Sequence, residues 1–329
     1  MLAIVLVGGF GTRLRPLTNH VPKQMLPICG LPMIEWVALQ LAKHGVSEMG
    51  LALGYRPDAF LNAYPGGTIA GLPYRVAVEP EVLGTAGAIR FALEELDVDE
   101  TVVALNGDVL TDLDITALVT FHQRQKAEGT IALQSVNDPS RFGVVTTDKN
   151  GRVAEFVEKP PKGTEPSNLI NAGTYVLEPE IINRIPAGQQ VSVEREVFPH
   201  MAREGSLYAV DSSTYWLDTG TPEQFIEANL DVMRGLRDFV PELPTNIVDP
   251  SAQIEESFLG EGTEVGANAR IKGSVLLSGC KISNNAKIRN SVLAEEVQIG
   301  DSAEIDGCVI GRGEVIEPGS EFARIKRPN

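Results

Sequence analysis

Apolar and polar residues alternate over the first 237 residues in a pattern that switches between strands and helices. The apolar run Ile4–Val7 predicts a buried strand, and apolar residues at helical spacing over residues 31–45 predict a helix that ends at Gly45. The same criteria predict strands at 49–53, 74–78, 101–105 and 130–136, and helices at 84–96 and 115–125. Strands joined by crossover helices form mostly parallel sheets covered on both faces. We therefore expect an α/β fold, in which ligands bind beyond the carboxyl ends of the strands.

A second pattern follows residue 247, where apolar residues recur with a period of 17 residues. Five aligned units occupy residues 248–254, 265–271, 282–288, 299–305 and 316–322. The fifth position of each unit is small: Ala252, Ala269, Ala286, Ala303 and Ser320. Aliphatic residues six apart with small residues between them resemble the hexapeptide repeat of left-handed parallel β-helices, in which three short strands form each coil.

These two patterns divide the chain into four predicted segments. Residues 1–237 form an α/β domain, and residues 238–247, which contain Pro241 and Pro244, form a linker. Residues 248–322 form the β-helix, and residues 323–329 a basic tail. Because the outer surfaces and ends of a β-helix offer strand edges that need cover, we expect a homo-oligomer that assembles through this module.

The charge balance narrows the choice of partners. The net charge is -16, from 28 Lys and Arg against 44 Asp and Glu, which argues against nucleic acid and anionic membranes as partners. The three cysteines, Cys29, Cys280 and Cys308, are too far apart for a disulfide framework or a zinc site, so reduced thiols are expected. The sequence shows neither a signal peptide nor an apolar run of the roughly 20 residues that a membrane span needs. We expect a cytoplasmic protein.

The acid-free opening stretch carries the clearest candidate site. No Asp or Glu precedes Glu35, and the strand that ends at Val7 runs into closely spaced glycines and then three cations. Glycines let backbone N–H groups approach an anion, and fixed cations neutralise it, so this segment predicts a phosphate site. Asn106-Gly107-Asp108 follows another predicted strand, and it should therefore lie at the same edge of the sheet.

Two other classes of protein fit less well. A dinucleotide-binding G-x-G-x-x-G would need glycine at position 14, where Leu14 stands, and Lys23 comes too late for a Walker P-loop. A hexapeptide acyltransferase relies on a histidine base, but all four histidines lie outside the repeats: His20, His44, His122 and His200. A role for the β-helix in assembly or stability is therefore favoured over acyl transfer.

The opening stretch has a long and specific pattern. It reads G-G-x-G-T-R-L-x-P-L-T over residues 8–18 and P-K-x-M-L-P over residues 22–27, which resembles the signature of the sugar-nucleotide pyrophosphorylases. Further stretches match this family in order over residues 2 to about 233: Glu79-Pro80, Gly84-Thr85-Ala86-Gly87, Asn106-Gly107-Asp108, Phe142-Gly143-Val144, Glu158-Lys159-Pro160, Asn171-Ala172-Gly173 and residues 215–221. Each of these stretches taken alone would be an ordinary turn. Together they imply a Rossmann-like nucleotidyltransferase domain.

The resemblance implies a role for each residue. A sugar-1-phosphate would attack the α-phosphorus of a nucleoside triphosphate in line, and pyrophosphate would leave. Arg15, Lys23 and Asp108 would be catalytic, and Asp108 and Asp218 would hold Mg²⁺. The implied nucleotide-binding residues are Val7, Gly8, Gly9, Gly11, Thr12, Arg13, Glu79, Gly84, Thr85 and Asn106. The implied sugar-phosphate residues are Gly143, Glu158, Lys159 and Asn171.

The choice of substrates stays open at this point. The G-T-A-G loop and the stretch Val191–Pro199 resemble mannose-1-phosphate guanylyltransferases, which favours GTP and mannose-1-phosphate. Gln24 departs from that branch, because K-Q-x-L-P is more typical of glucose-1-phosphate thymidylyltransferases. A thymidylyl- or uridylyltransferase, or a regulatory relative that binds nucleotide sugar without turnover, therefore remains an alternative.

Overall fold

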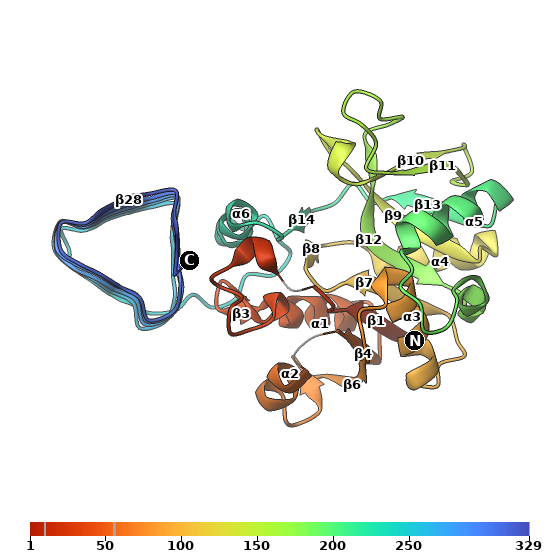
Figure 1. The fold of residues 1–329 in the computed structure, drawn as a ribbon, viewed down its shortest axis with the longest axis horizontal. Helices are drawn as coiled ribbons and strands as arrows, with labels where there is room; N and C mark the ends of the chain where they lie inside the picture. The colour runs from red at the N-terminus through yellow and green to blue at the C-terminus, as the bar shows by residue number, and fades with distance from the viewer. Residues whose placement is uncertain (10, 55–56, 329) are drawn as a thin grey trace. The chain divides into compact units, whose positions relative to one another are not determined.

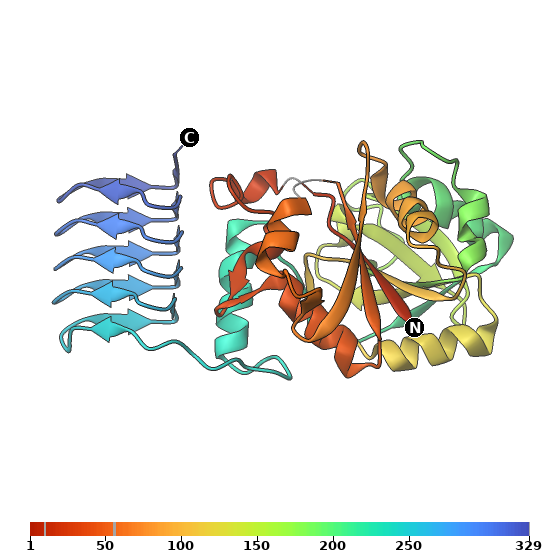
Figure 2. The same cartoon turned by 90° about the horizontal axis from the view of Figure 1, so that it is seen from below.

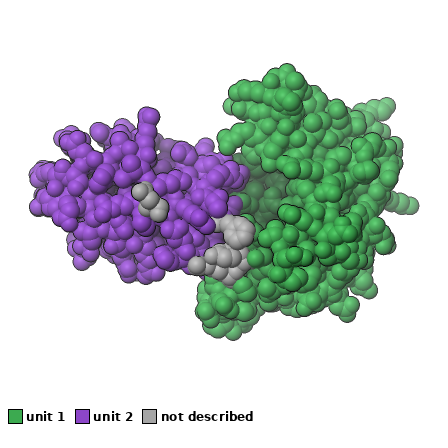
Figure 3. Space-filling model, viewed as in Figure 1, with its two compact units in different colours: residues 1–9, 34–216 green, residues 10–33, 217–329 purple. Residues whose placement is uncertain are grey.

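The computed structural model describes residues 1–9, 11–54 and 57–328. These residues form two compact units, and neither unit is continuous in the sequence. The first unit contains residues 1–9 and 34–216, and the second contains residues 10–33 and 217–329 (Figure 3). The acid-free stretch is thus divided: its strand and first glycines belong to the first unit, and its cations belong to the second.

A mixed sheet forms the centre of the first unit. Four parallel strands make one half of it: β1 (Leu2–Leu6), β4 (Glu48–Leu53), β6 (Leu72–Val78) and β7 (Val102–Asn106). The strand order is β11-β10-β12-β7-β1-β4-β6-β5, with β9 and β13 off this path. Residues Leu2–Val5 are almost fully buried, as expected for a strand covered on both faces. The predicted α/β fold is confirmed.

The other half of the sheet is built mostly from antiparallel pairs, which the alternation of elements did not predict. Strand β12 (Leu169–Leu177) lies antiparallel to β7, and it also pairs with β9 (Gly129–Ser135). The remaining strands of this sheet are β5 (Thr68–Ile69), β10 (Gly143–Thr147), β11 (Val153–Glu158) and β13 (Leu207–Asp211), which lies parallel to β9. Strand β8 (Val109–Thr111) lies outside it. Strand β12 is therefore the seam between the two halves of the sheet.

Helices cover the sheet of the first unit. Helix α3 (Gly84–Glu95) packs on β1 and β4, α4 (Ile115–Gln125) on β9, and α5 (Phe198–Glu204) on β11 and β13. Helix α1 (Met33–Lys43) begins at the boundary between the units, and α2 (Pro57–Ala63) follows β4. A π-helical turn, η5 (Val193–Val197), leads into α5.

The repeats of the second unit form a parallel β-helix of three five-stranded sheets, as predicted (Figures 1 and 2). One sheet contains β15 (Ile247–Val248), β18 (Glu264–Val265), β21 (Lys281–Ile282), β24 (Gln298–Ile299) and β27 (Val315–Ile316). The next contains β16 (Gln253–Glu255), β19 (Arg270–Lys272), β22 (Lys287–Arg289), β25 (Glu304–Asp306) and β28 (Glu321–Ala323). The last contains β17 (Phe258–Leu259), β20 (Val275–Leu276), β23 (Val292–Leu293), β26 (Val309–Ile310) and β29 (Lys326–Arg327).

The period of 17 residues sets the register of the β-helix. Ile254, Ile271 and Ile288 pair in sequence, and Ile305 and Phe322 continue the column. At the small position, Ala269, Ala286 and Ala303 are fully buried, because a larger side chain would not fit the interior, whereas Ala252 in the first coil is partly buried. Strand β29 lies in the segment that the sequence predicted as a tail, and it pairs with β26.

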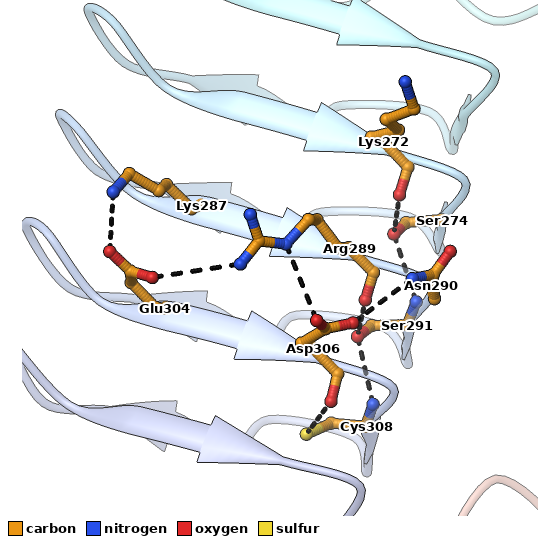
Figure 4. A network of polar contacts seen from close by, with 9 residues as sticks. All are labelled: Lys272, Ser274, Lys287, Arg289, Asn290, Ser291, Glu304, Asp306 and Cys308. Atoms are coloured by element: carbon orange, nitrogen blue, oxygen red, sulfur yellow. Dashed lines mark hydrogen bonds and ion pairs between the residues drawn. The ribbon is translucent and has the colours of Figure 1, made fainter.

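Polar ladders connect successive coils (Figure 4). The Ser291 hydroxyl donates to the Arg289 carbonyl and accepts from the Cys308 N–H at 3.0 Å, and Ser274 makes the same pair of bonds one coil earlier. Lys287 and Glu304 form an ion pair of 2.6 Å on the outer face. Each coil is thus bound to the next by side chains as well as by backbone pairing.

The second unit also contains helix α6 (Pro222–Met233), which packs against β2 (Pro27–Ile28) and β17. Strand β2 pairs with β3 (Leu31–Pro32), and β14 (Trp216–Asp218) precedes α6. The Cys29 backbone N–H donates to the buried Asn229 side chain of α6 at 2.8 Å. Across the described residues, we find no helix that is both long enough and apolar enough to span a bilayer.

Candidate active site

The carboxyl ends of the four parallel strands lie in register in the first unit. Leu6 pairs with Ala52 on one side and with Asn106 on the other. Two backbone bonds extend this alignment beyond the strands, from the Val7 N–H to the Ala52 carbonyl and from the Gly107 N–H to the Leu6 carbonyl. The first glycine turn and the Asn106-Gly107-Asp108 turn are therefore neighbours, as the sequence predicted.

Glu79 is a buried carboxylate at this edge, with 8% of its surface exposed. Its Oε2 accepts the Leu83 N–H at 3.0 Å, while a Cβ added to Gly8 or Gly54 would stand 3.7 or 3.6 Å from Oε1. Burial raises the pKa of Glu79, and the hydrogen bond from Leu83 opposes the rise. The structure thus places an acceptor beside the glycine turn, close to the sheet edge where a nucleotide would bind.

The G-T-A-G loop forms the first turn of α3, and its glycines allow close backbone packing. Gly84 has a φ of 71°, and a Cβ there would lie 2.6 Å from the Val191 carbonyl oxygen. The Thr85 hydroxyl donates to Glu194 at 2.8 Å and accepts from the Val193 N–H at 2.9 Å. The two stretches that resemble guanylyltransferases are therefore in direct contact, although 109 residues separate Thr85 from Glu194.

Asparagine side chains line the seam between β7 and β12. Gly173, at a φ of 76°, leaves space for Asn106, because a Cβ there would lie 2.6 Å from Asn106 Nδ2. Asn171 donates to the Tyr175 hydroxyl at 3.0 Å and accepts from the Gly173 N–H at 3.0 Å. A nucleotide candidate and a sugar candidate are thus adjacent.

Tyr175 is fully buried below these asparagines. Burial raises its pKa well above the usual value, and the negative charges of Glu194, Glu158 and Asp108 raise it further, against the hydrogen bond from Asn171. Because these three carboxylates act on one phenol, the predicted metal ligand Asp108 lies in the same electrostatic neighbourhood as Glu158 and Glu194. Composition and motifs gave no signal for Tyr175.

The candidates for the sugar phosphate lie together on β10 and β11. Gly143 pairs with Glu158, and a Cβ on Gly143 would stand 3.0 Å from Glu158 Oε2. Lys159 adopts a φ of 51° and its ammonium lies 3.2 Å from Glu158 Oε1. Its side chain is 57% exposed, so the ammonium can meet an anion from solvent.

Two aromatic residues beside these candidates were missed from sequence. The Trp216 indole donates to the Ala172 carbonyl at 2.8 Å, and the Phe142 ring meets it edge to face with 5.7 Å between centroids. Both residues stand within stretches that resemble the family, but nothing in the sequence indicated that they touch. An aromatic wall of this kind suits the apolar face of a sugar ring.

The cations of the acid-free stretch lie in the second unit, on two short 3₁₀ turns. The first, η1, contains Thr12–Leu14 and the second, η2, contains Lys23–Met25. Gly11 caps η1 with a φ of 58°, and a Cβ there would lie 2.9 Å from the Thr18 side chain and 3.3 Å from Lys23 Cβ. The glycine therefore brings the two turns together. Arg15 follows η1 and is exposed, as are Thr12 and Arg13.

Arg13 and Asp218 meet at Gly220 in the second unit. A Cβ added to Gly220 would lie 2.8 Å from Arg13 Nη2 and 3.1 Å from Asp218 Oδ1. The sequence assigned Arg13 to the triphosphate and Asp218 to the metal, and this geometry places a cation and a carboxylate side by side. The glycine of the T-G-T stretch, Gly220, is thus needed for the approach of these two side chains.

Gln24, which unsettled the choice of substrate, is 2% exposed on η2, and its Oε1 is buried with no hydrogen-bond partner in the described structure. Such an orphan acceptor costs about 1–3 kcal/mol. Gln24 is therefore buried in the second unit, and its side-chain amide is not at the surface.

The candidates thus fall into two groups. The first unit holds Val7, Gly8, Gly9, Glu79, Gly84, Thr85, Asn106, Asp108, Gly143, Glu158, Lys159 and Asn171. The second holds Gly11, Thr12, Arg13, Arg15, Lys23 and Asp218. Within the described ranges no three His, Cys, Asp or Glu side chains gather as a metal cluster. A metal ion held by Asp108 or Asp218 would need further oxygen ligands from substrate or water, which is how Mg²⁺ commonly binds.

Two features define the class of protein: an α/β unit with a glycine turn at its strand ends, and a parallel β-helix in the second unit. Residues 2–235 match the model of the nucleotidyl transferase family, and residues 242–320 match the model described as the GMPPB C-terminal domain. The chain belongs to the nucleotidyl transferase family.

Several curated relatives carry names that specify a reaction. A mannose-1-phosphate guanylyltransferase of Mycobacterium tuberculosis is 42% identical over 238 residues, which cover 71% of this chain and 65% of the relative. The catalytic subunit beta of the same activity from Danio rerio is 37% identical over 268 residues, 78% of this chain and 74% of the relative. A mannose-1-phosphate guanyltransferase of Aspergillus oryzae is 39% identical over 230 residues, 69% of this chain and 62% of the relative.

Proposed function

We propose that this protein transfers GMP from GTP to mannose-1-phosphate and so forms GDP-mannose and pyrophosphate. The observation that carries the proposal is the family match over residues 2–235, with relatives of 37–42% identity named for this activity. The contact between the G-T-A-G loop and the 191–199 stretch supports it, because both stretches resemble that branch.

The buried carboxylate of Glu79 favours guanine as the base. Guanine presents two neighbouring donors, its N1–H and its exocyclic amine, whereas thymine and uracil present one N–H between two carbonyl groups. A carboxylate accepts only, so it matches the guanine edge better than a pyrimidine edge. Oε1 lies toward Gly8 and Gly54, while Oε2 is held by Leu83.

In the proposed reaction a phosphate oxygen of the sugar-1-phosphate attacks the α-phosphorus of GTP. The bond to the bridging oxygen breaks on the opposite side, and its electron pair leaves with pyrophosphate. Arg13 and Arg15 hold the triphosphate through charge-assisted hydrogen bonds, and Lys23 stabilises charge at the α-phosphate. We assign Asp108 and Asp218 to Mg²⁺ because carboxylates and phosphate oxygens are the hard donors it prefers, and the ion would neutralise phosphate charge.

The sugar phosphate is assigned to the residues of β10, β11 and β12. Lys159 pairs with the phosphate, and its ammonium is already near Glu158 and exposed to solvent. Glu158 and Asn171 accept and donate hydrogen bonds to sugar hydroxyls. Phe142 and Trp216 supply an apolar wall beside them.

The test is a pyrophosphate-release panel with Mg²⁺ that crosses GTP, dTTP, UTP, ATP and CTP with mannose-1-phosphate and glucose-1-phosphate. We expect the highest kcat/KM for GTP with mannose-1-phosphate. Asp108→Ala should lower that value at least about 100-fold, while Asp99→Ala, at an exposed carboxylate after α3, should leave it unchanged.

The panel also separates the alternatives. A preference for dTTP or UTP with glucose-1-phosphate would establish the reaction that Gln24 suggested. If no pair of substrates reacts, the protein is a binding relative without turnover. If Asp108→Ala keeps full activity, the metal assignment is wrong.

We also propose that copies of the chain associate through the β-helix, in the cytoplasm. Ile247 on the first strand of the β-helix is 74% exposed and its neighbour Val248 is 38% exposed, which leaves apolar surface at that end. The three cysteines are free and buried, consistent with reduced thiols. Sedimentation velocity of the wild type against Ile247→Asp tests the association, which this substitution should weaken.

A further inference from the structure

The last coil of the β-helix touches the segment that carries the signature cations. The Lys326 ammonium donates to the backbone carbonyl of Arg13 at 2.6 Å, across 313 residues of sequence. Both residues belong to the second unit. The backbone of Lys326 is fixed, because it lies on β29 and pairs with Val309 of β26. The ammonium of Lys326, on a paired β-strand, therefore holds the Arg13 carbonyl of η1.

A second contact lies one residue beyond β26. Gly311 approaches the signature segment so closely that a Cβ there would stand 3.2 Å from Pro16 Cβ. The Gly311 N–H also donates to the Arg327 carbonyl, which ties this position to β29. The β-helix thus contacts the signature segment at Arg13 and again at Pro16, on both sides of Leu14.

These contacts matter because η1 has few bonds of its own. It contains three residues, and its backbone bonds are Leu14 N–H to the Gly11 carbonyl at 3.0 Å and Arg15 N–H to the Thr12 carbonyl at 3.3 Å. Such a short turn is marginal without outside support. The Arg13 carbonyl is held by Lys326, and the Arg13 guanidinium lies against Gly220 and Asp218. The residue is therefore fixed at both ends.

We propose that Lys326 is a positioning residue for the nucleotidyl transfer, and that the β-helix takes part in holding the triphosphate-binding segment. Lys326 acts through Arg13, because its ammonium donates to the Arg13 backbone carbonyl. This role of Lys326 rests on the proposed function, which assigns Arg13 to the triphosphate. Small displacements of a group that binds the reacting phosphates are costly, because the in-line geometry tolerates little error.

The experiment compares three variants of the full chain. Lys326→Met removes the ammonium and keeps the stem, Lys326→Arg keeps a donor, and Lys272→Met is the control, since Lys272 is an exposed lysine of β19 that pairs with Glu255. We expect Lys326→Met to raise the KM for GTP and to lower kcat/KM about tenfold, with the KM for mannose-1-phosphate unchanged. Lys326→Arg should restore most of the loss, and Lys272→Met should match the wild type.

Amide hydrogen exchange gives a readout that does not depend on turnover. Lys326→Met should speed exchange at the Leu14 and Leu17 amides, which bond within the signature segment, and leave β26 and the melting temperature unchanged. If exchange at these amides stays the same, the inference is wrong, whether or not the wild type is active. If β26 also loses protection and the melting temperature falls, Lys326 only stabilises the β-helix and the inference is again wrong. A wild type without activity refutes the proposed function alone.

Discussion

Replacing Thr85 by valine tests the contact between the G-T-A-G loop and η5. Valine keeps the shape of the side chain and removes its hydroxyl. Two bonds are lost: the one to the Glu194 carboxylate at 2.8 Å and the one from the Val193 N–H at 2.9 Å. Val193 is fully buried, so its N–H is left without a partner. Ser192 still donates to Glu194 at 2.7 Å, so that carboxylate keeps one bond.

The expected change in the free energy of unfolding follows from these two bonds. A hydrogen bond to a charged group contributes about 1.5–3 kcal/mol and an orphaned buried N–H costs about 1–3 kcal/mol. Because Ser192 remains and the site is partly exposed, we expect Thr85→Val to lower the free energy of unfolding by roughly 2–3 kcal/mol. With a typical urea m-value, the midpoint falls by about 1 M.

Urea unfolding followed by tryptophan fluorescence measures this shift, since Trp36 and Trp216 both lie in the first unit. The matched control is Thr120→Val, where an exposed hydroxyl donates to the Thr116 carbonyl of its own helix, and the change should stay within about 0.5 kcal/mol. Equal midpoints for the two variants would refute the reasoning. A higher KM for GTP with an unmoved midpoint would instead show that Thr85 contacts the nucleotide.

Three further substitutions have defined outcomes. Gly220→Ala places a methyl 2.8 Å from Arg13 Nη2 and should lower kcat/KM about tenfold in the pyrophosphate assay, because the guanidinium must move. Ser291→Ala should lower the free energy of unfolding of the β-helix, measured by circular dichroism in urea, by about 2 kcal/mol, because the Cys308 N–H loses its acceptor. Glu79→Gln should gain stability relative to the wild type as pH rises. Burial raises the pKa of Glu79 in the folded protein, so the stability that its protonated form contributes is complete below about pH 4.5 and is lost as the pH rises through the folded pKa. Glutamine does not titrate, so the variant should show no such loss. Unfolding measured at several pH values tests this difference.

Each of these substitutions has a control in the chain. Gly66→Ala adds a methyl where nothing lies within 4 Å, and it should keep full activity. Ser278→Ala removes an exposed hydroxyl of the same β-helix, and its unfolding midpoint should match the wild type. Glu81→Gln changes an exposed carboxylate near Glu79, and its stability should follow the wild type at every pH. A substitution that does no more than its control contradicts the corresponding prediction.

Local periodicity made much of the fold predictable. The 17-residue period specified the stacking of Ile271 on Ile288 and of Val275 on Val292, because each coil repeats the same geometry. Apolar runs with crossover helices likewise specified the parallel strands and the common edge of Leu6 and Asn106. Periodicity is a local property, and these features depend on neighbours at a fixed separation.

Features that depend on distant partners were not predictable. Strand β12 reads as an apolar run in either direction, and only tertiary packing makes it antiparallel to β7. The motifs indicated Thr85 and the 191–199 stretch separately, but the hydroxyl that joins them is a choice of rotamer and contact. Gln24 shows the same limit, since a residue letter does not reveal that the side chain is buried with an orphan oxygen. The site roles of the motif residues themselves stay predictions.

The make-up of the second unit also has a consequence for how the protein is synthesised. Residues 11–33 leave the ribosome well before their partners, because the partner of Cys29 is 200 residues further on and the partner of the Arg13 carbonyl is 313 residues further on. At 5–20 residues per second, the signature cations wait roughly 15–60 seconds for Lys326 to be added. Growing chains therefore lack these two contacts over that interval. We expect nucleotide affinity to reach its full value only once synthesis has passed residue 327, because the contact between Lys326 and the Arg13 carbonyl cannot form before then.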